Sequence, residues 1–230
     1  MAKLSSDPGP PAIAAEPYAF ALRPAAAALL IIDMQRDFLE PGGFGAALGN
    51  DVGQLRRAIA PTQRLLAAWR AAGLMVIHTR EGHRPDLSDL PESKRVRWRG
   101  ALTIGDHGPM GRILVRGEPG HAIIPELAPL AGEPVVDKPG KGAFHATPLG
   151  PALQQRGITH LVFMGVTTEV CVQTTMREAN DRGFECLMLE DCTGATDHGN
   201  HLAAVKMIKM QGGVFGAVAD SQAVLAALAG

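Results

Sequence analysis

The hydrophobic residues of this chain gather in short runs that alternate with amphipathic stretches. Six runs have the length and apolar character of buried strands, at residues 26–33, 74–79, 133–138, 159–166, 184–191 and 213–218. Helical patterns occupy residues 52–73, 171–181, 200–211 and 220–229. Strands that are apolar on both faces and alternate with helices are typical of parallel sheets. The pattern therefore predicts a single α/β domain with a doubly wound, mainly parallel sheet in the order 3-2-1-4-5-6.

Two regions break this alternation. Residues 1–24 are rich in Pro and Ala without periodicity, so we expect a mobile or surface-draped N-terminal arm ahead of a domain over residues 25–230. Residues 80–132 are rich in Gly, Pro and charged residues, and they are too many for a plain connection. Long loops in compact domains are usually functional. We therefore expect this region to be a substrate lid or an oligomer contact.

Composition narrows the class of protein. The chain has 230 residues, of which 46% are hydrophobic, and a formal net charge of −1, which gives no attraction to nucleic acid or an anionic membrane. The basic residues 94–99 are interpreted as a solvated loop or a subunit contact rather than an RNA site, because no other feature supports RNA binding. Three cysteines form no disulfide framework, and the N-terminus lacks the apolar core of a signal peptide. These features predict a cytoplasmic protein with reduced thiols and no membrane span.

Candidate chemistry lies where three of the predicted strands end. In the predicted order, strands one and four are neighbours, and ligands bind beyond the carboxyl ends of the strands at that point. Strand one ends at Asp33, strand three brings Lys138 to the same edge, and strand four leads through "GVTTEV" to Cys171. We therefore expect these three side chains to meet, although they are far apart in the sequence.

Each of the three residues also has a purely structural interpretation. Cys171 could be inert packing, as we expect for Cys186 and Cys192, but it lies near a helix start, where amide groups and the helix dipole lower the pKa of a thiol. Asp33 could cap a turn, and Lys138 could be a solvated loop lysine like Lys141. Together the three form a nucleophile, a base and a cation that orients both.

Metal and cofactor motifs are weak or missing in the sequence. Among eight histidines, His78 and His83 lie five residues apart, partly on a predicted strand, and no further ligand cluster follows. The chain has no dinucleotide fingerprint, phosphate-binding loop or GxSxG elbow. We therefore predict catalysis without a metal and without a cofactor.

Three segments carry a resemblance to a known family. "LLIIDMQRDF", "DKPGKGAF" and "GVTTEVCVQTTMREANDRGFECLMLEDCTGA" resemble the isochorismatase-like cysteine hydrolases, and the resemblance runs from about residue 22 to the C-terminus. It implies that Asp33, Lys138 and Cys171 form a catalytic triad. It also implies a cis peptide bond before Thr167, with the Thr167 and Cys171 amides forming an oxyanion hole.

Within the family, the chain resembles the branch that cleaves biuret and triuret. "HTREGHRPDLSDLP", "RGEPGHAIIPEL" and "GNHLAAVKMIKMQGGVFG" carry this resemblance. It implies hydrolysis of a ureido C–N bond through a thioester-like intermediate, a small ureido substrate as partner, and a homotetramer. By resemblance, Phe38 walls the pocket and Gln211 binds the far end of the substrate, although topology alone favours Gln211 as a surface residue at a helix end. His145 departs from relatives that have a smaller residue there.

Two other functions stay open at this point. One is a related thiol amidohydrolase that acts on ureidoacrylate or on another carboxamide. The other is a small-molecule-binding or redox protein that uses the same scaffold without catalysis. A complete set of Asp33, Lys138 and Cys171 favours an enzyme over the second alternative.

Overall fold

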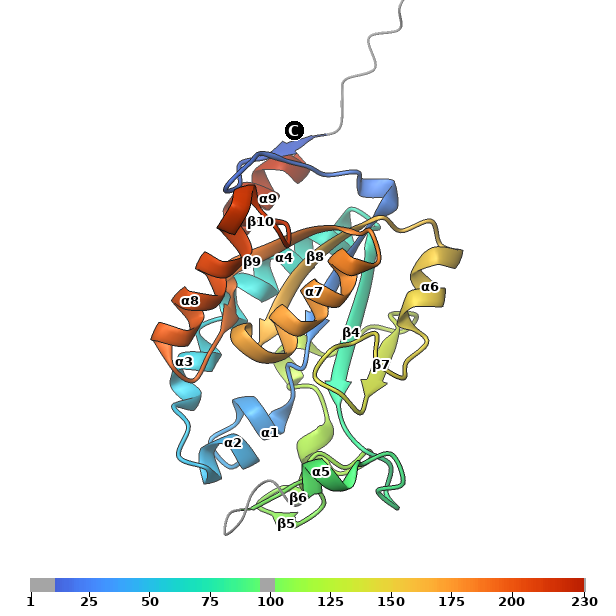
Figure 1. The fold of residues 1–230 in the computed structure, drawn as a ribbon, viewed down its shortest axis with the longest axis vertical. Coiled ribbons are helices and arrows are strands. Elements are labelled where there is room, and N and C mark those ends of the chain that lie inside the picture. Colours follow the sequence, from blue (N-terminus) through green and yellow to red (C-terminus); the bar gives the residue numbers. More distant parts are fainter. Residues whose placement is uncertain (1–10, 96–101, 230) are drawn as a thin grey trace, which may run out of the picture.

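Six parallel strands form the central sheet of the protein (Figure 1). The structure is a computed structural model, and it describes residues 11–95 and 102–229. The strands are β3 (Ala27–Ile32), β4 (Met75–Glu81), β7 (Val135–Lys138), β8 (His160–Val166), β9 (Glu185–Gly194) and β10 (Ala217–Ala219). Their order is β7-β4-β3-β8-β9-β10, and every neighbouring pair is parallel. Counted along the chain this is 3-2-1-4-5-6, so the predicted fold class and strand order are confirmed.

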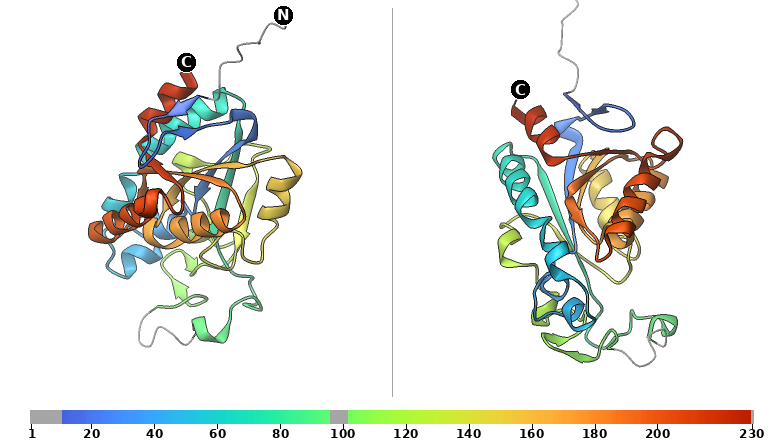
Figure 2. Two further views of the ribbon diagram at one scale, coloured as in Figure 1. Left: turned by 45° about the horizontal axis from the view of Figure 1, so that its top comes forward. Right: turned by 90° about the vertical axis from the view of Figure 1, so that its left-hand side faces the viewer.

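Helices cover both faces of the sheet (Figure 2). One layer holds α3 (Val52–Arg56), α4 (Ile59–Ala71) and α9 (Ser221–Ala229), and the other holds α6 (Leu149–Gln155), α7 (Gln173–Asp181) and α8 (His198–Lys209). The sequence of strand β3 is continuously apolar because helices cover both of its faces. Leu29 and Ile31 pack into the first layer, whereas Leu30 and Ile32 pack into the second, and all four are buried.

The helical stretch predicted over residues 52–73 is two helices. Asp51 caps α3 by accepting a hydrogen bond from the Gln54 amide at 3.2 Å. The break after Arg56 follows from Pro61 in the first turn of α4, because its ring would clash with the carbonyl of Arg57 in a continuous helix. Helix α6 was not predicted, since it is short and contains both Gly and Pro.

Most of the region over residues 80–132 lies beyond the carboxyl ends of the strands, at the bottom of Figure 1, whereas residues 125–132 run back along α4, where Gln63 and Arg70 donate to the carbonyls of Glu126 and Ala128. It holds α5 (Glu92–Arg95), the hairpin of β5 (His107–Gly108) and β6 (Gly111–Arg112), and the 3-10 turns η2 (Pro119–His121) and η3 (Pro125–Leu127). Residues 96–99 of the basic segment lie outside the described residues. Two short helices, α1 (Arg36–Leu39) and α2 (Phe44–Ala47), cover the same edge of the sheet after β3.

The described part of the N-terminal arm is tied to the domain. Strands β1 (Ala12–Ile13) and β2 (Phe20–Ala21) pair antiparallel, and Ile13 and Phe20 are buried in the core. A 3-10 turn, η1 (Pro24–Ala26), leads into β3. Residues 1–10 of the predicted arm lie outside the described residues. In the described chain, no helix has both the length and the apolar character needed to cross a bilayer.

Gly165 lies near the end of β8, at a position where the sheet leaves no room for a side chain. Its φ is +116°, and a Cβ there would clash with the carbonyl oxygen of Ile32 on β3. We expect Gly165→Ala to lower the free energy of unfolding by about 3 kcal/mol or more, because positive φ and overpacking both cost energy. Gly157→Ala is the matched control, since Gly157 also has positive φ but an open Cβ position, and it should cost about 1 kcal/mol. Urea unfolding measures both, and equal losses would contradict the steric argument.

Candidate active site

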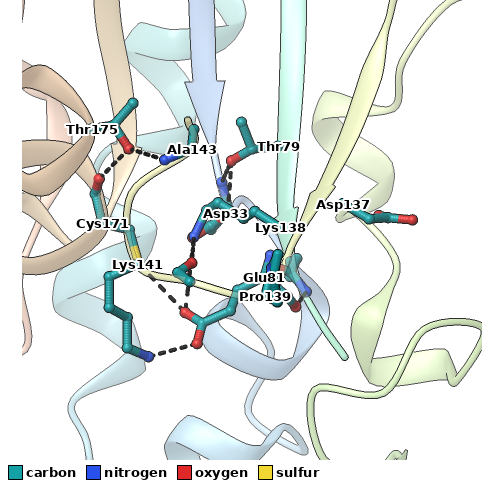
Figure 3. A network of polar contacts seen from close by, with 12 residues as sticks. Asp33, Thr79, Glu81, Asp137, Lys138, Pro139, Lys141, Ala143, Cys171 and Thr175 are labelled. Carbon is teal, nitrogen blue, oxygen red and sulfur yellow. Dashed lines mark hydrogen bonds and ion pairs between the residues drawn. The ribbon is translucent and has the colours of Figure 1, made fainter. Parts of the chain in front are cut away.

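Polar side chains from four strand ends meet at the carboxyl edge of the sheet (Figure 3). Asp33 follows β3, Glu81 ends β4, Lys138 ends β7, and Cys171 lies in the turn that follows β8. These strands are neighbours in the sheet, so their ends converge. The structure therefore brings together the three predicted residues Asp33, Lys138 and Cys171, and it adds Glu81.

Asp33 and Lys138 form a buried ion pair. Lys138 Nζ lies 2.7 Å from Asp33 Oδ2, and both side chains are fully buried. The Thr79 hydroxyl donates to Asp33 Oδ1 at 2.6 Å, and Lys138 Nζ donates to the Gly140 carbonyl at 2.9 Å. Burial lowers the pKa of Lys138, but attraction to Asp33, Cys171 and Glu81 outweighs it and leaves the pKa raised. The ammonium is therefore a fixed positive charge beside the thiol.

Glu81 forms a second charged pair at this edge. Its Oε1 lies 2.6 Å from Lys141 Nζ, and its Oε2 lies 4.0 Å from Lys138 Nζ. Burial raises the pKa of Glu81, but the two lysines outweigh burial, and the pKa is lowered. Gln35 fixes the backbone here, because its side-chain amide bonds both the N–H and the C=O of Glu81. Sequence reasoning missed Glu81, because the apolar run that marks its strand ends at Thr79, two residues before the true end of β4.

Cys171 is held by the turn in which it lies. The turn is π-helical, η4 (Thr168–Val172), and a cis peptide bond between Val166 and Thr167 precedes it, as the resemblance predicts. The Cys171 Sγ donates to Glu81 Oε2 at 3.5 Å. The Thr175 hydroxyl donates to the Cys171 carbonyl at 2.7 Å and accepts from the Ala143 amide at 3.1 Å. This contact ties the turn to the loop that follows Lys138.

The pKa of Cys171 differs from the sequence prediction. We expected the helix start to lower it, but burial raises it well above the usual value, and Asp33 and Glu81 raise it further against the pull of Lys138 and Lys141. Cys171 is only 5% exposed, so little water reaches the thiol to stabilise a thiolate. Burial therefore favours the neutral form of the thiol, and a group that can accept its proton would help to form a thiolate.

A cavity of about 330 Å³ opens onto the thiol. It is lined by Phe38, Leu48, Asn50, Leu55, Glu81, Lys141, Val166, Thr167, Glu169, Val170, Cys171 and Thr196. The predicted pocket residue Phe38 and the predicted oxyanion residue Thr167 are both in this lining. The volume lies at the small end of the range for ligand sites, which suits a compact substrate.

The structure does not bring Gln211 to this cavity. Gln211 is exposed in the turn η5 (Met210–Gly212), which follows the last residue of α8. Helix α8 starts beyond the carboxyl end of β9 and runs back along the sheet, so its end lies at the opposite edge, near Tyr18. Within one chain, Gln211 therefore cannot contact a ligand at Cys171. His145 is exposed and lies against Gly140 in the loop after Lys138.

The side chains around the thiol include one set of metal-ligand types. In residues 11–95 and 102–229, this set is Asp33, Glu81 and Cys171, whose ligand atoms lie within 4.8 Å of one another. The Lys138 ammonium lies 2.7 Å from Asp33 and 4.0 Å from Glu81, so a cation already balances these carboxylates. A divalent metal ion there would face electrostatic repulsion from Lys138.

Comparisons with known proteins identify the family and the fold. The isochorismatase domain profile matches residues 27–223. A cysteine hydrolase from Pseudomonas syringae pv. phaseolicola 1448A superposes with a TM-score of 0.79 at 27% identity, covering 95% of this chain and 97% of that one. An isochorismatase family protein from Desulfovibrio vulgaris subsp. vulgaris str. Hildenborough superposes with a TM-score of 0.72 at 28% identity, covering 89% and 99%. The fold is also that of N-carbamoylsarcosine amidase from Thermoplasma acidophilum, with a TM-score of 0.65 at 23% identity, covering 85% and 96%. The chain therefore belongs to the isochorismatase-like hydrolase family.

Proposed function

We propose that this protein is a cysteine-dependent amidohydrolase that cleaves a ureido C–N bond of a small urea oligomer, biuret or triuret. The observation that carries the proposal is the thiol of Cys171 at the wall of a small cavity, with the Asp33–Lys138 ion pair and Glu81 behind it. A nucleophile, a proton acceptor and a fixed cation within one cluster are the parts that covalent amide hydrolysis requires.

The first half-reaction forms a covalent intermediate. Asp33 takes the proton of Cys171, and the nearby Lys138 ammonium stabilises the thiolate that results. The thiolate attacks the ureido carbonyl, and the Thr167 and Cys171 amides donate to the oxygen that becomes negative. The C–N bond then breaks, and Asp33 returns the proton to the departing nitrogen as ammonia leaves. This leaves a thioester-like acyl group on Cys171.

The second half-reaction restores the enzyme. Asp33 accepts a proton from a water molecule, which attacks the acyl carbon and releases the product. The Cys171 sulfur leaves as thiolate and recovers its proton from Asp33. For biuret, one water is consumed, and the products are allophanate and ammonia. The raised pKa of Cys171 favours the return of this proton to the sulfur.

The proposal also covers the assembly and the rival substrates. We propose a homotetramer, as the family resemblance implies, and a contact between Gln211 and the substrate would then have to come from another copy of the chain. The neighbouring structure that is named an amidase acts, by its name, on N-carbamoylsarcosine. Ureidoacrylate and other carboxamides are therefore the rival substrates to test.

Ammonia release from a substrate panel tests the proposal. We expect the purified protein to release ammonia from biuret or triuret faster than from ureidoacrylate or nicotinamide. Alkylation of the thiol should abolish release, and exhaustive dialysis against a chelator should leave it unchanged, because Lys138 supplies the positive charge near the thiol. No ammonia from any compound, or turnover that survives alkylation, would overturn the proposal. Activity that is lost on chelation and restored by a metal ion would show that a metal takes part.

A further inference from the structure

Glu169 places a carboxylate in the wall of the Cys171 cavity that the mechanism does not use. It lies in the π-helical turn two residues before the thiol, and its side chain lines the same cavity. Its Oε2 is buried and, among the described residues, has no hydrogen-bond partner. A buried carboxylate oxygen without a donor is costly, so a ligand that brings an N–H donor to it would be favoured.

The charges around the cavity favour the same kind of ligand. Its lining includes two carboxylates, Glu81 and Glu169, and one cation, Lys141. Lys141 Nζ lies 2.6 Å from Glu81 Oε1, so its charge is already balanced. In the described part of the chain, Glu169 forms no such ion pair within 4 Å. A bound carboxylate would therefore meet an unbalanced negative charge, whereas a neutral group with N–H donors would not.

The surroundings of Glu169 are consistent with an unused acceptor. Burial raises the pKa of its carboxyl group, contacts with its own backbone and the Thr167 hydroxyl lower it, and the nearby Asp197 raises it further. The pKa is raised overall, which is typical of a carboxylate that has lost water without gaining a cation. Asn50 also lines the cavity, and its side-chain amide can donate to a ligand carbonyl.

We propose that Glu169 is the specificity-determining residue of this site, and that it accepts a hydrogen bond from the distal N–H₂ group of a neutral ureido substrate. This inference rests on the proposed function and deepens it. The substrate class is then a compound with an amide at the scissile end and an uncharged N–H donor at the other. Carbamoyl compounds that end in a carboxylate are rejected by the same residue.

The test compares two substrates of similar length that differ at the far end. Biuret ends in an N–H₂ group, and N-carbamoylglycine ends in a carboxylate. The wild-type enzyme should have the higher kcat/KM on biuret. Glu169→Gln should reduce kcat/KM on biuret by about 5- to 10-fold, since a neutral amide oxygen replaces a charged acceptor, while the value on N-carbamoylglycine should hold or rise. The change should fall mainly on KM, because the distal contact is made in the ground state as well.

Dependence on pH gives a second readout that does not need a variant. Protonation of Glu169 removes its negative charge, so wild-type KM for biuret should rise as the pH falls through the pKa of that group. The same change should improve binding of N-carbamoylglycine. The Glu169→Gln enzyme should lose both trends. An exposed carboxylate at the amino end of β9 provides the matched control, and Glu185→Gln should leave every value unchanged.

Two outcomes would overturn the inference while leaving an amidohydrolase in place. One is a wild-type preference for N-carbamoylglycine, and the other is an unchanged substrate ratio in a folded Glu169→Gln enzyme. Calorimetric binding of both compounds to the Cys171→Ser protein separates the inference from the proposed function, because it needs no turnover. Stronger binding of biuret there supports the role of Glu169 even if wild-type enzyme releases no ammonia. Equal binding of both compounds contradicts it.

Discussion

Cys171→Ser should lower ammonia release by about a thousandfold or more while the protein stays folded. A serine hydroxyl is far harder to ionise than a thiol, and this position is buried, which raises the cost of the anion further. The carboxylates beside it are too weakly basic to compensate. The exchange of sulfur for oxygen is small, so the cavity should keep its shape and still bind substrate.

Cys186→Ser is the matched control for this variant. Cys186 is also a buried cysteine, but it lies in β9, outside the lining of the Cys171 cavity. Its sulfur lies 3.3 Å from the Phe184 carbonyl, so a serine hydroxyl there has an acceptor. Turnover should therefore persist in Cys186→Ser. If a folded Cys171→Ser protein released ammonia at a rate close to that of the wild type, the thiol would not be the nucleophile.

The sequence could predict the sheet and the meeting of three residues because both follow from local patterns. Runs that are apolar on both faces indicate parallel strands, and the ends of such strands share one edge. Asp33 and Lys138 each end a strand with a sharp change from apolar to polar residues. Cys171 follows strand β8 after a short polar stretch. The positions of all three therefore depend on strand order alone.

Glu81 was missed because its strand was predicted too short. The polar residues Arg80 and Glu81 hid the end of β4, which the pattern placed at Thr79. In the sheet, Glu81 pairs in register with Lys138, and this long-range pairing extends the strand. A pattern read along one segment cannot contain that contact.

Two other predictions differ from what the single chain shows, for different reasons. The helix start near Cys171 lowers a thiol pKa only if water or a cation can stabilise the thiolate, and burial at this position outweighs the helix. The placement of Gln211 depended on similarity to relatives. The direction of α8 was already implied by the fold, because a helix that follows a parallel strand runs back toward the opposite edge.

Asp33→Asn should cause a loss of kcat/KM of about 10²- to 10⁴-fold, the range expected when a positioned base is removed. Asparagine keeps the shape of the side chain but cannot take the proton of Cys171. Glu81→Gln is the matched comparison, since Glu81 is also a buried carboxylate near Lys138 and is the hydrogen-bond partner of the thiol. Its loss should be about tenfold or less, because a glutamine oxygen can still accept from the thiol.

The comparison decides which carboxylate removes the proton. Lys138 and Lys141 lower the pKa of Glu81, so Glu81 is a poor proton acceptor, and its charge serves mainly to hold Lys141.

The lowered pKa of Glu81 also makes the stability of the protein depend on pH. The stabilisation from the Glu81–Lys141 pair is present above the ordinary glutamate pKa and declines as the pH falls through the lowered value. Both variants leave Lys138 with one fewer partner, which can cost about 3–5 kcal/mol for a buried pair, so urea unfolding must accompany the kinetics. Alkylation of Cys171 at neutral pH should slow in neither variant, because both carboxylates raise the pKa of the thiol and loss of either charge favours the thiolate. If Glu81→Gln shows the larger loss in turnover, Glu81 is the base, and Asp33 serves to hold Lys138 in place.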